Sequence, residues 1–274
     1  MAIGRSPIWL GPPVKERSRD WYYDDMNRGA PVVAARDQAR FYGAPVGILV
    51  LDCVAPYVPG SVGNASTYRR PVRFRPIPGC TVERLIFAPD DALEAAVVES
   101  ARELVAEGAQ MLSSNCGFML RYQRPVAEAV DALVALSSLL LVPFLQVTLP
   151  TGRALGVITA SERSLTPDVL ALAGIEGEAQ LAIAGLDDEP AFRAAFIDCD
   201  GGLDVERVRD ETAGAALRLV DQRPDIGAIL LECSELPPYA PAVQRATGLP
   251  VFDFVSMIEF FAGGFDRSEF NGLY

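Results

Sequence analysis

Short apolar runs alternate with longer amphipathic stretches along the chain from residue 46 onward. The apolar runs are short and rich in Val, Ile and Leu, which predicts buried strands. They are Gly47–Asp52, Gly108–Cys116, Ala154–Ala160, Gln180–Ala184 and Gly227–Cys233, with shorter candidates at Val82–Phe87, Pro143–Val147 and Pro250–Phe254. The alternation of such runs with helical stretches predicts parallel sheets built from strand–helix–strand units.

Helices are expected between these strands. Residues 92–107 and 204–222 carry apolar side chains at helical spacing, and a third helix is expected over 125–138. Thr166 and Pro167 are residue types preferred at the N-cap and first position of a helix, here over 164–170. Residues 55–80 contain many Pro and Gly and predict a long loop, which in a compact protein is often functional.

The pattern occurs twice. The strand at Gly47 has a counterpart at Gly156, and the run that ends at Cys116 has a counterpart that ends at Cys233. This duplication predicts an α/β fold of two pseudo-symmetric Rossmann-like lobes with parallel sheets, and an active site in the cleft between them. The expected divisions are an N-terminal extension over 1–45, a first lobe over 46–150 plus 254–274, and a second lobe over 151–253.

The two matching cysteines are the main candidates for chemistry. Each ends a predicted strand and precedes a segment that can open a helix, where the pKa of a thiol can be lowered. Two thiols that face one cleft could act as an acid/base pair without a cofactor. We therefore expect Cys116 and Cys233 to be catalytic, with their sulfurs roughly 7–10 Å apart so that one carbon fits between two proton-transfer contacts.

Composition narrows the possible chemistry. The chain has no His and a single Lys, Lys15, in a polar N-terminal segment. Imidazole-dependent nucleophiles, imidazole metal sites and a pyridoxal phosphate Schiff base are therefore not expected. The net charge of −12 argues against nucleic acid. The chain shows neither a membrane span nor the apolar core of a signal peptide, so a cytoplasmic location is expected.

Several segments carry a family resemblance. They are the first strand ending in Asp52, the block from Ser114 to Met119, the block from Glu232 to Tyr239, and Thr247–Asp253. With these segments the chain resembles the aspartate/glutamate racemase superfamily over most of residues 46–262. Within it, Cys-Gly-Phe-Met and Glu-Cys-Ser-Glu-Leu-Pro-Pro-Tyr resemble the Alma-type dimethylsulfoniopropionate lyases of marine algae and their bacterial relatives. The resemblance implies two lobes, one catalytic Cys per lobe and no cofactor or metal.

The motifs differ from the better-known members of the superfamily. The best-known amino-acid racemases have Asn-Thr after the first Cys, where this chain has Gly117 and Phe118. The algal lyases carry an acidic residue at the position of Asn115. These differences leave open which substrate the resemblance implies.

Polar residues near the two thiols are candidates for substrate binding. The resemblance implies that Ser114, Asn115, Gly117 and Ser234 hold a substrate carboxylate, and that Glu235 matches an acidic residue of similar enzymes. Asp52 and Thr159 end equivalent strands of the two halves and are further candidates. Arg69, Arg70, Arg73 and Arg75 could clamp an anion, although a solvated surface is the favoured interpretation.

The expected function is a cofactor-independent racemase or epimerase that removes a proton α to a carboxylate. The first alternative is β-elimination as in the dimethylsulfoniopropionate lyases, which gives acrylate and dimethyl sulfide. The second is a carboxylate-binding protein without catalysis. The expected partners are a small carboxylate substrate and further copies of the chain, in a homo-oligomer (dimer or tetramer), with neither nucleic acid nor membrane.

Overall fold

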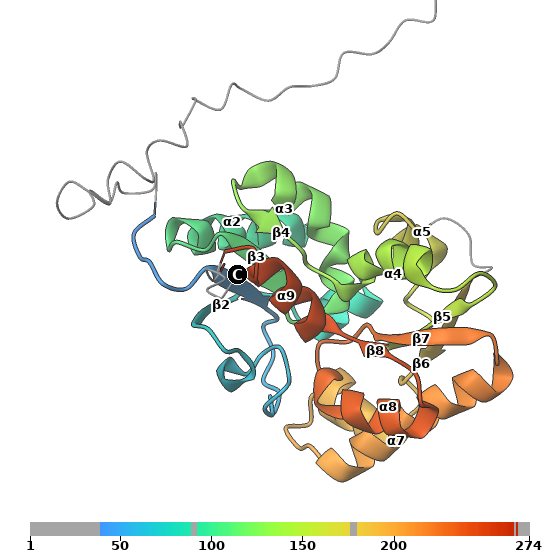
Figure 1. Cartoon of the computed structure of the whole chain (residues 1–274). Coiled ribbons are helices and arrows are strands. Elements are labelled where there is room, and N and C mark those ends of the chain that lie inside the picture. The colour runs from blue at the N-terminus through green and yellow to red at the C-terminus, as the bar shows by residue number, and fades with distance from the viewer. Residues whose placement is uncertain (1–38, 89–91, 176–179, 266, 268–274) are drawn as a thin grey trace, which may run out of the picture. The chain divides into compact units, whose positions relative to one another are not determined.

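A computed structural model describes residues 39–88, 92–175, 180–265 and 267. Two four-stranded sheets form its framework, and every strand pairing in them is parallel. The strand order is β2-β1-β3-β4 in the first sheet and β6-β5-β7-β8 in the second, so the two sheets share one topology (Figure 1). The predicted α/β fold with two lobes is confirmed.

The first sheet lies early in the chain. Its strands are β1 (Val46–Val50), β2 (Val72–Pro76), β3 (Met111–Ser114) and β4 (Leu133–Val134). Helix α2 (Ala92–Ala106) turns Leu93, Val97 and Leu104 into the core, as the helical spacing predicts. Gly108 follows α2 with φ +100°, a conformation that glycine adopts without the steric cost of a Cβ. Helix α3 (Gln123–Ala129) precedes β4.

The second sheet repeats this arrangement. Its strands are β5 (Ala154–Thr159), β6 (Leu181–Gly185), β7 (Ile226–Leu231) and β8 (Val251–Phe252). Its helices are α5 (Pro167–Ala171), α6 (Pro190–Phe192), α7 (Val205–Gln222) and α8 (Ala240–Thr247). Asp204 caps α7 because its side chain accepts a hydrogen bond from the Arg207 N–H. Helices α7 and α8 lie together beside this sheet (Figure 1).

The chain returns to the first sheet at its end. Helix α9 (Phe254–Ala262) buries Phe254, Met257 and Ile258 in a cluster with Val46 and Met111 of the first sheet. A second cluster joins the two sheets, because it contains Leu49 and Leu112 as well as Leu155 and Leu230. This continuous apolar packing fixes the carboxyl ends of the two sets of strands relative to one another.

Four predicted elements differ from the structure. Residues 143–147, predicted as a strand, belong to helix α4 (Val142–Thr148), and 82–87 lie in a π-helical turn (Glu83–Phe87) instead of a strand. A short apolar run fits either a strand or a helix, and Pro143 stands where a helix tolerates it, in the first turn. The helix predicted over 125–138 ends at Ala129 because β4 follows, and the predicted loop 55–80 contains β2.

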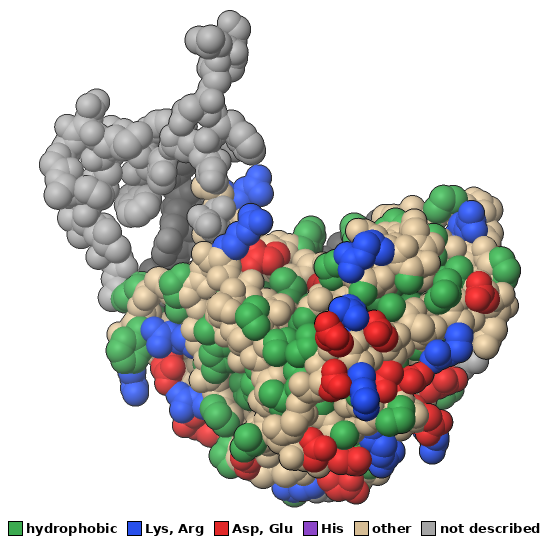
Figure 2. All heavy atoms as spheres, turned by 90° about the horizontal axis from the view of Figure 1, so that it is seen from below, with side chains coloured by type: hydrophobic (Ala, Val, Ile, Leu, Met, Phe, Trp, Pro, Cys, Tyr) green, Lys and Arg blue, Asp and Glu red, His purple; other side chains and the backbone are tan. Residues whose placement is uncertain are grey.

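On the face drawn in Figure 2, many Arg side chains lie beside acidic ones. Arg70 pairs with Glu259 at 3.2 Å and Arg75 with Glu103 at 3.4 Å, so these guanidinium groups of the 69–75 segment engage the protein itself. None of the described helices is both long and apolar enough to cross a membrane. The extension expected over 1–45 lies, for residues 1–38, outside the described residues.

Candidate active site

A pocket lies at the carboxyl ends of the two central strands of each sheet. Leu51, Asn115 and Cys116 line it from the first sheet, and Ala160, Glu232 and Cys233 line it from the second. Its cavity volume is about 40 Å³. The carboxyl ends of parallel strands are the usual place for a ligand in α/β proteins. Both candidate thiols therefore reach one pocket, which joins the two halves of the duplication.

Each thiol follows a strand and faces a backbone N–H group. Cys116 is the residue before the 3-10 helix Gly117–Tyr122, and the Phe118 N–H interacts with its sulfur. Cys233 follows β7, and the Glu235 N–H interacts with its sulfur in the same way. These N–H groups favour a thiolate, because they place positive partial charge against the sulfur.

Burial has a larger effect on the two thiols than those N–H groups. The Cys116 and Cys233 side chains are almost fully buried, which raises the pKa of both thiols well above the ordinary value. Nearby acidic groups raise both values further, above all Glu232. The lowered thiol pKa that the sequence predicted is therefore wrong, because desolvation of the buried sulfurs raises their pKa more than the neighbouring N–H groups lower it.

Asn115 fixes the wall of the pocket through both ends of its amide. Its Oδ1 accepts a hydrogen bond of 2.8 Å from the Leu51 N–H, and its Nδ2 donates one of 3.0 Å to the Tyr57 hydroxyl. The amide thus ties the end of β3 to the loop after β1. The Tyr57 oxygen also lies 3.6 Å from the Cys53 sulfur, and either group can be the donor in that contact.

Replacing Asn115 by Ala should destabilise the protein and also reduce its activity. The buried Leu51 N–H would lose its acceptor, at a cost of about 1–3 kcal/mol in the free energy of unfolding measured with urea. Gln123 offers a matched control outside the pocket, since its amide accepts from the Leu136 N–H and donates to the Val134 carbonyl. Gln123→Ala should lose similar stability but keep its activity. Equal losses of activity in both variants would contradict a specific role for Asn115.

Glu232 is the acidic counterpart of Asn115 in the second half. It precedes Cys233 as Asn115 precedes Cys116, and the N–H groups of Glu232 and Asn115 bond to the equivalent Ile158 and Leu49 carbonyls. The Glu232 side chain is fully buried, and its Oε2 accepts a 2.9 Å hydrogen bond from the Thr159 hydroxyl. Burial raises the pKa of Glu232 to about 7. Glu232 lies in the motif from Glu232 to Tyr239, but the sequence pattern did not predict it as a site residue.

Glu235 and Ser234 connect the second thiol loop to the first half of the chain. One Glu235 oxygen accepts from Ser61 and the other lies 3.1 Å from the Ser234 hydroxyl, which donates to the Asn115 carbonyl. Burial raises the pKa of Glu235 to about 7 as well. The loop that carries Cys233 is therefore held against the loop that carries Cys116.

The other predicted site residues lie in different places. Gly117 lines the pocket, whereas Ser114, Asp52 and Thr159 do not. The Ser114 hydroxyl lies 2.6 Å from the Leu136 carbonyl and 2.9 Å from the Cys116 carbonyl, both in its own half, and Asp52 is an exposed residue that accepts from the Gly79 N–H. Thr159 is connected to the pocket indirectly, because its hydroxyl donates a hydrogen bond to Glu232, which lines the pocket. Tyr57 also lines the pocket; it was not predicted as a site residue, although it belongs to the long loop expected over 55–80.

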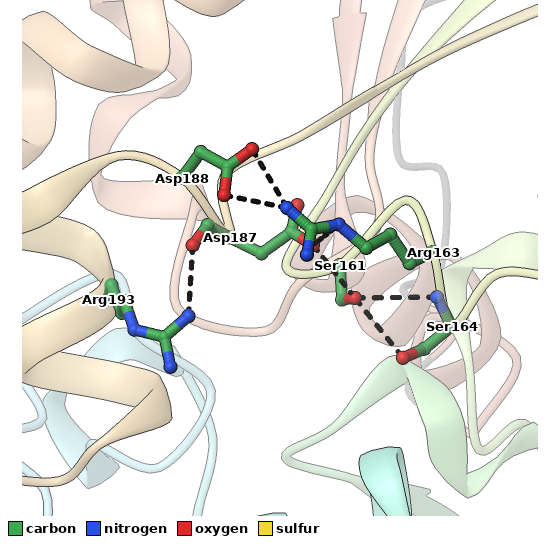
Figure 3. A network of polar contacts seen from close by, with 6 residues as sticks. All are labelled: Ser161, Arg163, Ser164, Asp187, Asp188 and Arg193. Atoms are coloured by element: carbon green, nitrogen blue, oxygen red, sulfur yellow. Dashed lines mark hydrogen bonds and ion pairs between the residues drawn. The ribbon is translucent and has the colours of Figure 1, made fainter.

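A network of polar contacts joins residues 161–164, after β5, to residues 187–193 in the second half of the chain (Figure 3). The Ser161 hydroxyl, just after β5, lies 3.2 Å from an Asp187 oxygen and 3.1 Å from the Ser164 hydroxyl. Arg163 pairs with Asp187 and Asp188, and Arg193 donates to the Asp187 carbonyl. The network ties the loop after β5, which carries Ala160, to the segment that contributes Phe192 and Phe196 to the pocket.

Known proteins resemble the chain in sequence, although no protein-family model matches it. A dimethylsulfoniopropionate lyase from Durusdinium sp. clade D is 30% identical over 239 residues, which cover 84% of this chain and 78% of the relative. Dimethylsulfoniopropionate lyase 7 of Emiliania huxleyi is 29% identical over 261 residues, or 90% of this chain and 76% of the relative.

Solved structures resemble the chain in fold. A variant of arylmalonate decarboxylase aligns with a TM-score of 0.52 at 20% identity, over 80% of this chain and 92% of the other. Allantoin racemase from Pseudomonas fluorescens and a glutamate racemase from Bacillus anthracis each reach 0.54, at 15% and 13% identity. Both cover 81% of this chain, with 91% and 81% of their own. The chain therefore shares its fold with these enzymes, and by its sequence it belongs to the family of the dimethylsulfoniopropionate lyases.

Proposed function

We propose that the protein is a cofactor-independent lyase that acts on a small carboxylate with a sulfonium group on its β-carbon. One observation carries the proposal. The pocket contains two buried carboxyl groups, Glu232 and Glu235, but its described lining includes neither Arg nor Lys. An ordinary carboxylate would add negative charge there without any compensation, at a high cost in a buried site. A substrate that also carries a positive charge suits the pocket.

The aromatic residues of the pocket suit the same substrate. Phe118, Phe192 and Phe196 line it, and the face of an aromatic ring attracts a cation. The Tyr57 hydroxyl is the natural partner for the substrate carboxylate, since burial raises the pKa of Tyr57 and keeps its proton in place. The small cavity volume favours a short, acyclic molecule. The sequence relatives named above are lyases of this substrate class.

The reaction requires one base. A thiolate of the pair takes the proton from the carbon beside the carboxylate, and the C–H electron pair becomes the second bond between the α- and β-carbons. The bond between the β-carbon and sulfur breaks, and its electron pair stays on the departing sulfur. The products are acrylate, a neutral dialkyl sulfide and the protonated thiol. Because the sulfide leaves uncharged, no general acid is needed for its departure.

Racemisation is the second candidate function. The observation that favours it is the pair of buried thiols, one from each half of the chain, in a single pocket. Such a pair offers a proton donor or acceptor to either face of a substrate carbon. The known two-lobe racemases resemble the chain in fold.

A product assay distinguishes the two functions. The reduced protein is incubated in deuterated buffer with dimethylsulfoniopropionate, and separately with a panel of amino acids and hydantoins. We expect acrylate by NMR and dimethyl sulfide in the headspace. The analogue 3-(methylthio)propionate, which keeps the carboxylate but has an uncharged thioether sulfur, should give neither product. Deuterium at the α-carbon of a recovered amino acid or hydantoin, without elimination from dimethylsulfoniopropionate, would contradict the lyase proposal and support racemisation instead.

A further inference from the structure

Glu232 occupies an unusual position for a carboxyl group. Its Oε2 accepts from the Thr159 hydroxyl and the Ala160 N–H lies against the same carboxyl group, but its buried Oε1 has no hydrogen-bond partner among the described residues. Oε1 lies against the Cα of Gly117, only 1.6 Å from where a Cβ on that residue would stand. The carboxyl group of one half of the chain thus fills the side-chain space of the residue next to Cys116.

This position is costly for a charge. An ionised carboxylate that is buried without a cation and only half hydrogen-bonded loses much of its solvation free energy. The titratable groups that face it across the pocket are Cys53, Tyr57, Cys116, Cys233 and Glu235, and none of them carries a positive charge. A charge on Glu232 opposes a charge on either Cys116 or Cys233, since Glu232 is the strongest charged influence on both thiols.

We propose that Glu232 controls the charge of the site: it competes with Cys116 and Cys233 for the negative charge that the pocket can hold, and the thiol base forms readily only while Glu232 carries a proton. This inference rests on the proposed function, in which a thiolate is the base. Glu232 acts through the two thiols, because its own charge sets how readily they ionise, and it is a positioning residue in this sense. Asn115, its counterpart, fills the equivalent place with an uncharged amide, so Glu232→Gln copies what the first half of the chain already does.

The sign of the pH effect follows from the same geometry. Below about pH 7 Glu232 is protonated and leaves a thiol free to ionise, so the amount of thiolate rises tenfold per pH unit. Above about pH 7 Glu232 takes the negative charge, and the amount of thiolate levels off although the pH still rises. Glu232→Gln removes the competitor, so its thiolate should keep rising.

The test measures thiolate directly and needs no substrate. Iodoacetamide labelling is followed at each cysteine by peptide mass spectrometry between pH 6 and pH 9. At pH 6 the wild type and Glu232→Gln should label Cys116 and Cys233 at equal rates. At pH 8 the variant should label both about ten times faster, because this pH lies one unit above the pKa of about 7 for Glu232.

Two further variants test the roles of the groups next to Glu232 in the same labelling experiment. Glu235→Gln should accelerate labelling of Cys233 alone, because Glu235 raises the pKa of Cys233 and is not among the groups that raise that of Cys116. Thr159→Val removes a hydrogen bond that lowers the pKa of Glu232, so the levelling-off should move to higher pH. The buried Cys80 serves as an internal reference for the integrity of the fold.

The outcomes are distinct. Faster labelling at pH 8 that is confined to Cys116 and Cys233 supports the proposal. Labelling of these two thiols that is unchanged or slower in Glu232→Gln overturns it, and so does an equal acceleration at Cys80, which would mean that the substitution had loosened the fold. Since no substrate is used, these results are independent of whether elimination from a sulfonium compound is observed.

Discussion

Cys116→Ala and Cys233→Ala should differ in activity, with elimination falling about 10²–10⁴-fold in the variant that lacks the proton-abstracting thiol. The other variant should retain measurable elimination, because a neutral sulfide leaves without an acid. Both thiols line the pocket, so either substitution removes a sulfur close to the bound substrate. The measurement is the rate of acrylate formation with each purified variant under reducing conditions.

The same pair of variants also tests the second candidate function. A two-base racemase needs both thiols for turnover, so both alanine variants would be inactive, and each Cys→Ser variant would exchange the α-proton of one enantiomer only. Cys80→Ala is the control, because Cys80 is fully buried outside the pocket and its loss reports the cost of removing a core thiol. Unimpaired elimination in both alanine variants would contradict a thiol base altogether.

Much of the fold could be predicted from the sequence because the same pattern of apolar runs occurs in both halves of the chain. The apolar runs before Cys116 and Cys233, together with the matching strands at Gly47 and Gly156, predict two similar sheets and the meeting of both thiols at their carboxyl ends. Similar Pro-led apolar runs stand at 250–254 and 143–147, but only the first of them contains a strand, β8, and the run at Pro143 does not form one. Its apolar residues fit helix α4, where Val142 and Leu145 are buried while Phe144 and Val147 are exposed.

The charges of the site could not be predicted in this way. Glu232 follows a strand, where an acidic side chain usually reaches solvent or caps the next helix. Its burial depends on the missing side chain of Gly117, a residue of the other half of the chain. The raised pKa of each thiol likewise depends on how closely the two halves pack, a property that no local pattern of residues carries. The site is therefore a product of tertiary packing, although the sequence indicates where it lies.

Gly117→Ala should be strongly disruptive for this reason. A Cβ there would stand 1.6 Å from Glu232 Oε1 and 2.4 Å from its carboxyl carbon, so either the carboxyl group or the backbone beside Cys116 must move. We expect the free energy of unfolding to fall by about 1–3 kcal/mol, as for other overpacked cores. Activity should fall as well, because the displaced carboxyl group or backbone belongs to the pocket wall. Urea unfolding and acrylate formation measure the two effects.

A control and a double variant show whether the clash with Glu232 is the cause. Gly156→Ala also adds a methyl group to a buried glycine, but its nearest contacts are 3.4 Å away, so it should be tolerated far better. Glu232→Ala empties the space that the new Cβ needs. The double variant Gly117→Ala/Glu232→Ala should therefore be more stable than the sum of the two single effects predicts, by about 0.5–3 kcal/mol. Strict additivity would mean that the two residues do not share this space, and would remove the geometric basis for assigning Glu232 control over the thiols.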